Sequence, residues 1–282
     1  FYDKVILGLP GRDEQIENYC QTIRNMGKLG IPMLGHHFSP TFVWRTTTQA
    51  PGRGGARATA FDERQLRPGD NAFREMMARK RHLLDYDVFE AVDGMTADDL
   101  FDNYRYFMDA VLPTAEKAGV MLALHPDDPP MDLLRGMPRL VFQPELYQRV
   151  IDISPSKSNK LELCLGSIQE MTHGSVYDAI EQYGSQGRIS YVHFRNVKGK
   201  VPKYDEVFVD EGDIDMLRAL ALLEAHNFDG VIIPDHTPEI LCSAPWHAGM
   251  AFALGYMRSA LQMASKGLLK EILEQGEGSY EG

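Results

Sequence analysis

The stretch Val120-Met-Leu-Ala-Leu-His125 shows the pattern on which the fold prediction depends, a short apolar run that ends in a polar side chain. The pattern recurs in Leu161-Glu-Leu-Cys164, Ile189-Ser-Tyr-Val-His193 and Gly230-Val-Ile-Ile-Pro-Asp235, and earlier in Gly30–Phe38. Apolar residues at helix spacing lie before, between and after these runs, at 16–26, 96–111, 213–225 and 248–264. Short buried strands that alternate with helices indicate a parallel sheet covered on both faces.

This alternation favours an α/β architecture, a single (β/α)8 TIM barrel over residues 1–282. Five strands are recognisable instead of eight, so we expect the others before Phe1, where the chain opens without a Met, or in segments without a clear pattern. Residues 39–85 are rich in turn residues and arginine, which predicts a long loop that serves as a lid or an interface. We also expect a helix break or kink at Pro113 and a frayed tail at 276–282.

Composition excludes several classes of function. The chain has 282 residues, of which 44% are hydrophobic and 24% charged, as in ordinary globular proteins. Its net charge of −11 argues against nucleic acid as a partner. It has neither a run of 18 apolar residues nor a signal-peptide pattern, so we expect no membrane span and no secretion. Three widely spaced cysteines, Cys20, Cys164 and Cys242, do not make a disulfide framework, which favours the cytoplasm.

Four of the predicted strands end in a side chain that binds metal ions: His125, Cys164, His193 and Asp235. In a parallel barrel the carboxyl ends of the strands open on one face, so these four side chains are expected to converge there. Imidazole, thiolate and carboxylate together suit a divalent transition metal such as Mn²⁺, Fe²⁺, Co²⁺ or Zn²⁺. A single Cys or His at a strand end is more often a buried structural residue, but four in succession favour a metal site.

Two short polar segments are expected at the pocket rim. His37 lies at the end of the first predicted strand and is a candidate for substrate binding. Asp127 and Asp128 lie beside His125 on a proline-rich loop, where they either orient an imidazole or form a turn, and Asp127 is also a candidate for substrate binding.

Further candidates follow the later strands. Arg195 and Asn196 come directly after His193 and are able to hold the carboxylate or hydroxyls of a substrate, although an arginine that lies in solvent or pairs with an aspartate is the alternative. His236 follows Asp235, and because adjacent side chains diverge it faces the substrate as an acid or base, or forms a hydrogen bond within its loop.

These motifs resemble the mannonate dehydratase family, in order from about residue 6 to about residue 260. The similar blocks are Gly8-Leu-Pro-Gly-Arg-Asp13, Ile16–Gly27, Leu124-His-Pro-Asp-Asp-Pro-Pro130, Cys164-Leu-Gly-Ser167, Val192-His-Phe-Arg-Asn196 and Pro234-Asp-His236. The occurrence of the last four blocks in this order is specific to the family.

The resemblance implies a xylose-isomerase-like TIM barrel that dehydrates D-mannonate to 2-keto-3-deoxy-D-gluconate, a hydro-lyase step of hexuronate catabolism. It implies Mn²⁺, or alternatively Fe²⁺ or Co²⁺, on His125, Cys164, His193 and Asp235, and His236 as the catalytic histidine. A homo-oligomer, a dimer, is the expected assembly, with a small sugar acid as the other partner.

The chain also departs from the family pattern. Members usually begin with two more strand–helix units, and an arginine usually stands where this chain has Ile233. A catalytic tyrosine in a Gly-Tyr-Gly stretch before the last helix is not found; a rough alignment puts His247 or Met250 there. These departures affect the prediction of the substrate and of the second proton carrier, and they leave the prediction of a metal site unchanged.

The expected reaction removes a proton from C2 and a hydroxyl from C3, so it needs two proton transfers. We expect His236 to perform one, and His247 or a water on the metal to perform the other. Arg195 and arginines of the 45–81 segment would clamp the substrate carboxylate. The alternatives are a metal-dependent sugar isomerase or epimerase on the same barrel, and a non-catalytic relative that binds sugar acids; a hydrolase of phosphate esters or nucleic acid fits the charge less well.

Overall fold

The computed structural model describes residues 3–41, 43–67, 69, 71–78, 82 and 84–269. These residues form two compact units. The first contains the chain up to Trp44 together with Gln65–Leu161, and the second contains Arg45–Arg64 and the chain from Glu162 onward. The expected frayed tail at 276–282 lies outside the described residues. Among the residues that are described, no helix is both long and apolar enough to span a bilayer.

The first unit contains the start of the predicted parallel sheet. Strand β1 (Met33–His36) pairs in parallel with β4 (Met121–Leu124), which in turn pairs with the beginning of β7 (Asn159–Cys164). The register places His36 beside Leu124 and Leu124 beside Leu161. Leu122, Ala123, Leu124 and Leu161 are buried, as expected for strands covered on both faces.

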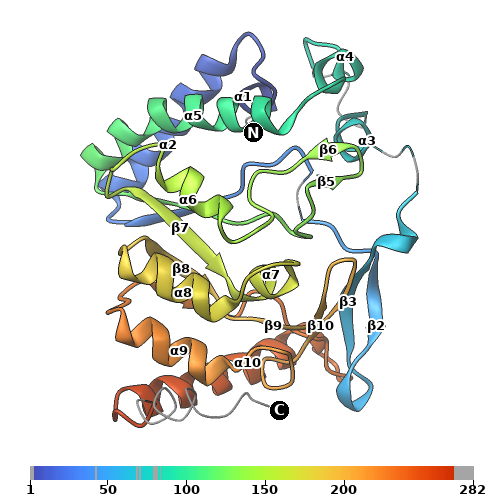
Figure 1. The fold of residues 1–282 in the computed structure, drawn as a ribbon, viewed down its shortest axis with the longest axis vertical. Helices are drawn as coiled ribbons and strands as arrows, with labels where there is room; N and C mark the ends of the chain where they lie inside the picture. Colours follow the sequence, from blue (N-terminus) through green and yellow to red (C-terminus); the bar gives the residue numbers. More distant parts are fainter. Residues whose placement is uncertain are drawn as a thin grey trace. The chain divides into compact units, whose positions relative to one another are not determined.

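Three helices of this unit pack together: α1 (Asp3–Leu7), α2 (Arg12–Lys28) and α5 (Ala97–Ala118) (Figure 1). Helix α5 begins with a capping box in which Thr96 and Asp99 bond each other's backbone N–H. It continues through Pro113 to Ala118, so the expected break is wrong. Pro113 has no backbone N–H, so the helix loses one hydrogen bond, the one to the carbonyl of Asp109. Because Asp109 lies on the exposed side of the helix, water can donate to this carbonyl instead.

Shorter elements complete the first unit: α3 (Ala72–Ala78), α4 (Val88–Val92), α6 (Leu146–Ile151) and the hairpin of β5 (Leu133–Leu134) and β6 (Met137–Pro138).

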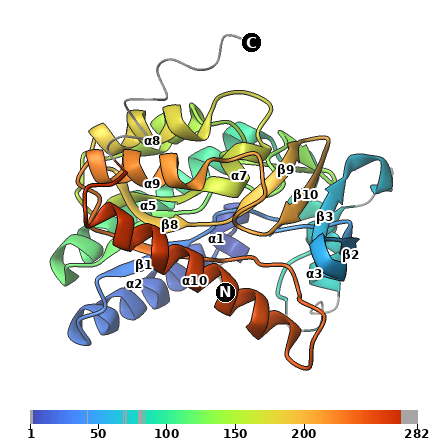
Figure 2. The ribbon, with the colours of Figure 1, turned by 90° about the horizontal axis from the view of Figure 1, so that it is seen from below.

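The second unit continues the parallel arrangement. Strand β8 (Ile189–His193) pairs with β11 (Val231–Ile233), with His193 in register with Ile233. The helices of this unit are α7 (Leu165–Glu170), α8 (Val176–Ser185), α9 (Met216–Ala225) and α10 (Pro245–Ala264). Helix α9 packs against both α8 and α10 (Figure 2). All five predicted strands and all four predicted long helices are therefore present.

An antiparallel sheet in the second unit was not predicted. Its strands follow the order β2 (Thr47–Pro51), β3 (Arg57–Asp62), β10 (Lys203–Val207) and β9 (Asn196–Lys200). The prediction of one long loop over 39–85 is thus wrong for 47–62, which is a hairpin, and for Ala72–Ala78, which forms α3. The hairpin is held by pairing with β10, where the rings of Phe61 and Tyr204 stack with centroids 5.6 Å apart.

Candidate metal centre and active site

Three of the four predicted ligands lie in the second unit, at the carboxyl ends of its strands. Cys164 is the last residue of β7 and His193 the last of β8, and Asp235 follows two residues after the end of β11. Because β8 and β11 are parallel and in register at His193 and Ile233, the last two ligands arrive at the same edge of the sheet.

The ligand-type atoms of these residues lie close together. His193 Nδ1 is 3.3 Å from Asp235 Oδ2, and the ligand atoms of Cys164 and His193 lie within 4.8 Å of one another. Asp235 has a φ of +55°, a left-handed conformation that is uncommon outside glycine and is found most often at functional sites. The backbone turn directs its carboxylate to His193.

Charge complementarity within the cluster is strong. Burial lowers the pKa of His193, but its hydrogen bonds with Asp235, Cys164 and Glu162 outweigh this and raise the pKa to about 12. Burial acts to raise the pKa of Asp235, yet the hydrogen bond from His193 and the positive charges of His236 and Arg195 hold it well below its usual range. In this arrangement an anionic carboxylate therefore faces cationic partners.

Glu162 is a member of this cluster that the sequence analysis missed. Its Oε1 lies 2.5 Å from His193 Nε2, and the residue is 4% exposed. A single charged residue inside the apolar run Leu161-Glu-Leu-Cys164 was the available signal. Carboxylate, imidazole and thiol donors that meet at one buried point fit a divalent transition metal, so the residues present fit the predicted group.

Arg195 lies beneath this cluster and is 1% exposed. Its Nε is 3.2 Å from both Cys164 Sγ and Asp235 Oδ2. Nη1 donates to Glu170 at 2.7 Å and to Glu206 at 2.9 Å, and Nη2 donates to Ser167. The guanidinium therefore bonds two candidate metal ligands and two buried carboxylates, and in this arrangement it positions the metal ligands.

Asn196 is also engaged within the protein. Its Oδ1 accepts from the backbone N–H of Val197 and Ile214, and its Nδ2 donates to the carbonyls of Val209 and Ile214. Both donors and both acceptor positions of the amide are thus used to hold the loop before α9. The structure gives Asn196 a structural role, and its expected contact with substrate stays a prediction.

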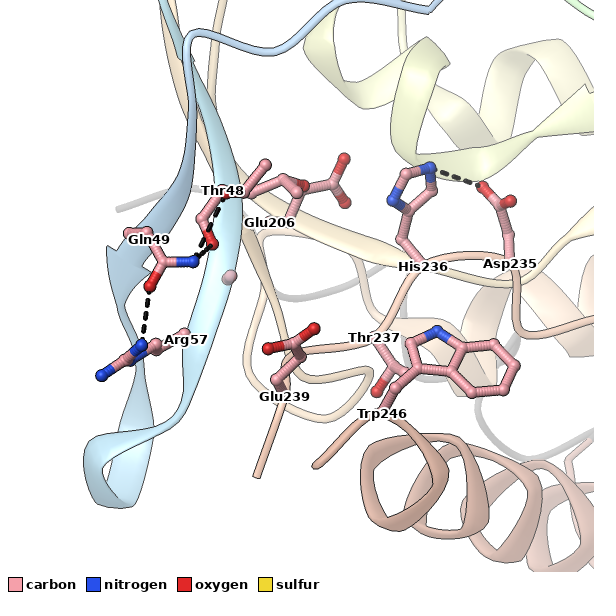
Figure 3. Close-up of a pocket in the computed structure, with 11 residues that line it drawn as sticks. Thr48, Gln49, Arg57, Glu206, Asp235, His236, Thr237, Glu239 and Trp246 are labelled. Atoms are coloured by element: carbon pink, nitrogen blue, oxygen red, sulfur yellow. Dashed lines mark hydrogen bonds and ion pairs between the residues drawn. The ribbon is translucent and has the colours of Figure 1, made fainter. Parts of the chain in front are cut away.

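His236 lines a pocket of about 490 Å³ in the second unit (Figure 3). Its Nε2 lies 3.7 Å from Asp235 Oδ2, which connects it to the candidate metal ligands. Thr48, Gln49 and Arg57 of the β2–β3 hairpin border the pocket on one side (Figure 3).

His247 lies outside the residues that line this pocket. It is exposed in the first turn of α10, and its ring contacts that of Trp246 at 5.3 Å between centroids. Trp246 lines the pocket instead. The sequence analysis did not single out Trp246, although it comes just before the helix predicted at 248–264 and tryptophan often contributes to binding surfaces.

The fourth predicted ligand, His125, lies in the first unit directly after β4. Its ring packs edge-on against His37, with centroids 5.8 Å apart. His37 Nε2 is 3.2 Å from Asp127 Oδ1.

Asp127 is held firmly in the first unit and is 1% exposed. Its Oδ1 pairs with Arg139 Nε at 2.9 Å, and its Oδ2 accepts from the N–H of Leu140 and Val141. These bonds fix Asp127 so that it orients the ring of His37, and through that ring it supports His125. Direct contact of Asp127 or His37 with substrate stays a prediction.

The comparison with known proteins decides the family. A model of the family described as D-mannonate dehydratase (UxuA) matches residues 1–271. The chain belongs to the D-mannonate dehydratase family. Mannonate dehydratases of Lactococcus lactis and Geobacillus thermodenitrificans are each 32% identical to this chain over 253 residues. Both matches cover 83% of this chain, together with 70% of the Lactococcus protein and 68% of the Geobacillus protein.

Solved structures agree with this assignment. The crystal structure of mannonate dehydratase from Streptococcus suis serotype 2 superposes with a TM-score of 0.82 at 32% identity, covering 95% of this chain and 77% of that one. The structure of an L-ribulose 3-epimerase matches with a TM-score of 0.53 at 16% identity, which shows a shared fold alone. This match covers 96% of this chain and 73% of the epimerase chain. The predicted fold class, an α/β chain of the xylose-isomerase-like TIM-barrel type, is confirmed, and so is the assignment to a family of hydro-lyases.

Proposed function

We propose that this member of the D-mannonate dehydratase family converts D-mannonate to 2-keto-3-deoxy-D-gluconate and water. One observation supports the proposal most strongly. The thiol of Cys164, the imidazole of His193 and the carboxylate of Asp235 meet at a point next to the pocket that contains His236. A metal beside an acid–base group is what dehydration next to a carboxylate requires.

The proposed metal ligands are His125, Cys164, His193 and Asp235, and the proposed ion is Mn²⁺, with Fe²⁺ and Co²⁺ as alternatives. Support for His125 comes from the first unit, where it directly follows β4, a strand that runs parallel to β1 and to the beginning of β7. When bound, such an ion acts as a Lewis acid for the charge that develops on the substrate carboxylate.

His236 is the proposed acid–base group of the reaction. Its ring lines the pocket, 3.7 Å from the carboxylate of Asp235, where a base can remove the C2 proton of a bound sugar acid. The C2–H electron pair then forms the C2–C3 double bond while the C3 hydroxyl leaves with a proton as water. The resulting enol rearranges to the 2-keto acid, so atoms and electrons balance.

Other roles are proposed with less direct support. Protonation of the leaving hydroxyl by His247, and binding of the sugar acid by Arg195, Asn196, Asp127 and His37, remain predictions. So do a homodimer, a cytoplasmic location and a place in hexuronate catabolism.

A turnover assay tests the proposal. Protein stripped by a chelator is reloaded with Mn²⁺, Fe²⁺ or Co²⁺ and given D-mannonate, with D-gluconate in parallel, and the 2-keto-3-deoxy product is measured colorimetrically. We expect metal-dependent product from D-mannonate. His236→Ala is expected to lower kcat by about 10²- to 10⁴-fold with metal content unchanged.

The matched control is His226→Ala, because His226 bonds Glu181 at 2.7 Å and does not line the pocket. Wild-type protein that holds metal but forms no product would contradict the proposed function. Full activity of His236→Ala would contradict only the assignment of His236.

A further inference from the structure

The β2–β3 hairpin forms a polar wall of the pocket opposite the metal side. Gln49 and Arg57 lie on this wall, and Glu239 and Trp246 border the pocket beneath His236 (Figure 3). The wall thus carries an amide and a guanidinium, and Glu239 adds a carboxylate next to it, so that together they donate and accept hydrogen bonds.

Backbone hydrogen bonds tie this wall to the chain segment that carries His236. The N–H of Arg57 donates to the carbonyl of Glu239 at 3.0 Å, and the N–H of Glu239 donates to the carbonyl of Arg57 at 2.7 Å. Glu239 is three residues beyond His236. The polar wall is therefore held in register with the acid–base group.

The side chains of the wall are also oriented in advance. Arg57 Nη1 donates to Gln49 Oε1 at 2.8 Å, and Gln49 Nε2 donates to the carbonyl of Thr48 at 2.8 Å (Figure 3). Because the five N–H donors of a guanidinium lie in one plane, the bond to Gln49 restricts the directions that the others can take. Pre-orientation of this kind reduces the entropy lost when a ligand binds.

An open-chain sugar acid has two chemically different ends. In the proposed reaction its C1 carboxylate and C2 lie next to the metal ligands and His236. Its last carbons and their hydroxyls therefore extend toward the polar wall on the other side of the pocket. Each hydroxyl both donates and accepts, which matches the guanidinium and carboxylate found there. The indole of Trp246 offers an apolar surface to the carbon chain.

We propose that Gln49, Arg57 and Glu239 form a subsite that binds the terminal hydroxyls of the sugar acid and so selects substrates by the end remote from the reaction. This inference rests on the proposed function. A site built to bind a hydroxyl discriminates strongly against an analogue that lacks it, because its polar groups lose their partner.

The test compares D-mannonate with 6-deoxy-D-mannonate, which has the same reacting carbons but no C6 hydroxyl. We expect wild-type, metal-loaded enzyme to prefer D-mannonate in kcat/KM by about 10- to 100-fold. In the Arg57→Met variant we expect kcat/KM for D-mannonate to fall toward the kcat/KM for the deoxy acid. The kcat/KM for the deoxy acid itself should change little. Gln49→Ala should have the same effect to a smaller extent.

The control is Arg64→Met, because Arg64 follows the same hairpin with a side chain that is 79% exposed and paired with Asp62. Thermal unfolding of each variant shows whether it is folded. Equal use of both acids by the wild type would overturn the subsite. So would an equal fall for both acids in Arg57→Met, which would place Arg57 at the carboxylate. A wild type without any turnover of D-mannonate would instead overturn the proposed function, and the subsite with it.

Discussion

Arg195 shows how one side chain organises the metal side of the site. Its Nε contacts Cys164 and Asp235, while Glu170 and Glu206 hold the other end of the guanidinium. This approach requires Gly166, where a Cβ atom would lie 2.5 Å from Nη1 of Arg195. The Leu-Gly-Ser sequence after Cys164 thus makes room for the arginine that directs the thiol.

We expect Arg195→Lys to weaken metal binding by roughly 10- to 100-fold, as is typical when a group that orients metal ligands is changed. A lysine ammonium keeps the charge but cannot reach both ligands and both carboxylates. Co²⁺ titration, followed through the thiolate-to-cobalt absorption band, measures the loss. Arg258→Lys on the exposed face of α10 serves as the control. Unchanged metal affinity with a raised KM for D-mannonate would show that Arg195 binds substrate instead.

His36 provides a residue-scale prediction about pH. It is buried at the end of β1, 3.2 Å from the hydroxyl of Tyr104, and burial, with a smaller effect from His37, lowers its pKa to about 3. Between about pH 3 and 6.5 the unfolded chain binds a proton at this position and the folded chain does not. The free energy of unfolding therefore rises with pH across this window.

The free energy of unfolding is expected to fall by about 1.7 kcal/mol on going from pH 6.5 to pH 5.0, because the histidine of the unfolded chain goes from half to almost fully protonated. Urea unfolding of the chelated protein at both pH values measures it. His36→Gln, which keeps a polar contact for Tyr104, should lose this part of the pH dependence. An identical dependence in the variant would mean that other groups cause it.

Helix packing in the first unit depends on one close approach. The C-terminal ends of α2 and α5 meet at Gly27, where a Cβ atom would lie 2.5 Å from the carbonyl oxygen of Ala118. Because the obstacle is helix backbone, a side chain at this position has to push the two helices apart. In α10, by contrast, Gly255 has nothing within 4 Å of its Cβ position.

These two helical glycines predict opposite effects of the same substitution. Gly27→Ala is expected to lower the free energy of unfolding by about 1–3 kcal/mol through overpacking. Gly255→Ala is expected to raise it, by up to about 1 kcal/mol, because alanine favours a helix. Denaturant unfolding of both variants checks the pair. A stabilising Gly27→Ala would show that α2 and α5 can separate without cost.

At the scale of the whole molecule, metal binding contributes to stability if the ion binds only the folded chain. The free energy of unfolding then rises by about 4 kcal/mol at a free metal concentration 1,000 times Kd. Mn²⁺ or Co²⁺ should therefore raise the midpoint of thermal unfolding of the chelated protein. Removing one ligand should reduce that increase.

Cys164→Ser tests this dependence, with Cys242→Ser at an exposed position as the matched control. We expect the metal-induced rise in midpoint to shrink in the first variant and to persist in the second. Equal shifts in both variants would contradict the assignment of Cys164 as a ligand.

Local sequence patterns were sufficient for the parallel strands and the long helices. The apolar run ending at His193 and the helix that follows Thr96 are both encoded by neighbouring residues, through periodicity and capping. For the same reason Cys164, His193 and Asp235 could be predicted to meet, since parallel strands bring their carboxyl ends to one edge.

Only the tertiary structure decided what surrounds those ligands. Strands β2 and β3 carry few large apolar residues, and β10, which pairs with β3 and joins their hairpin to the sheet, lies far along the chain. The burial of Arg195 between Glu170 of α7 and Glu206 of β10 likewise depends on two elements and on the link between β8 and β9. Strand pairings and ion pairs of this kind join residues distant in sequence, so no local pattern encodes them, whereas helix and strand periodicity arises between near neighbours.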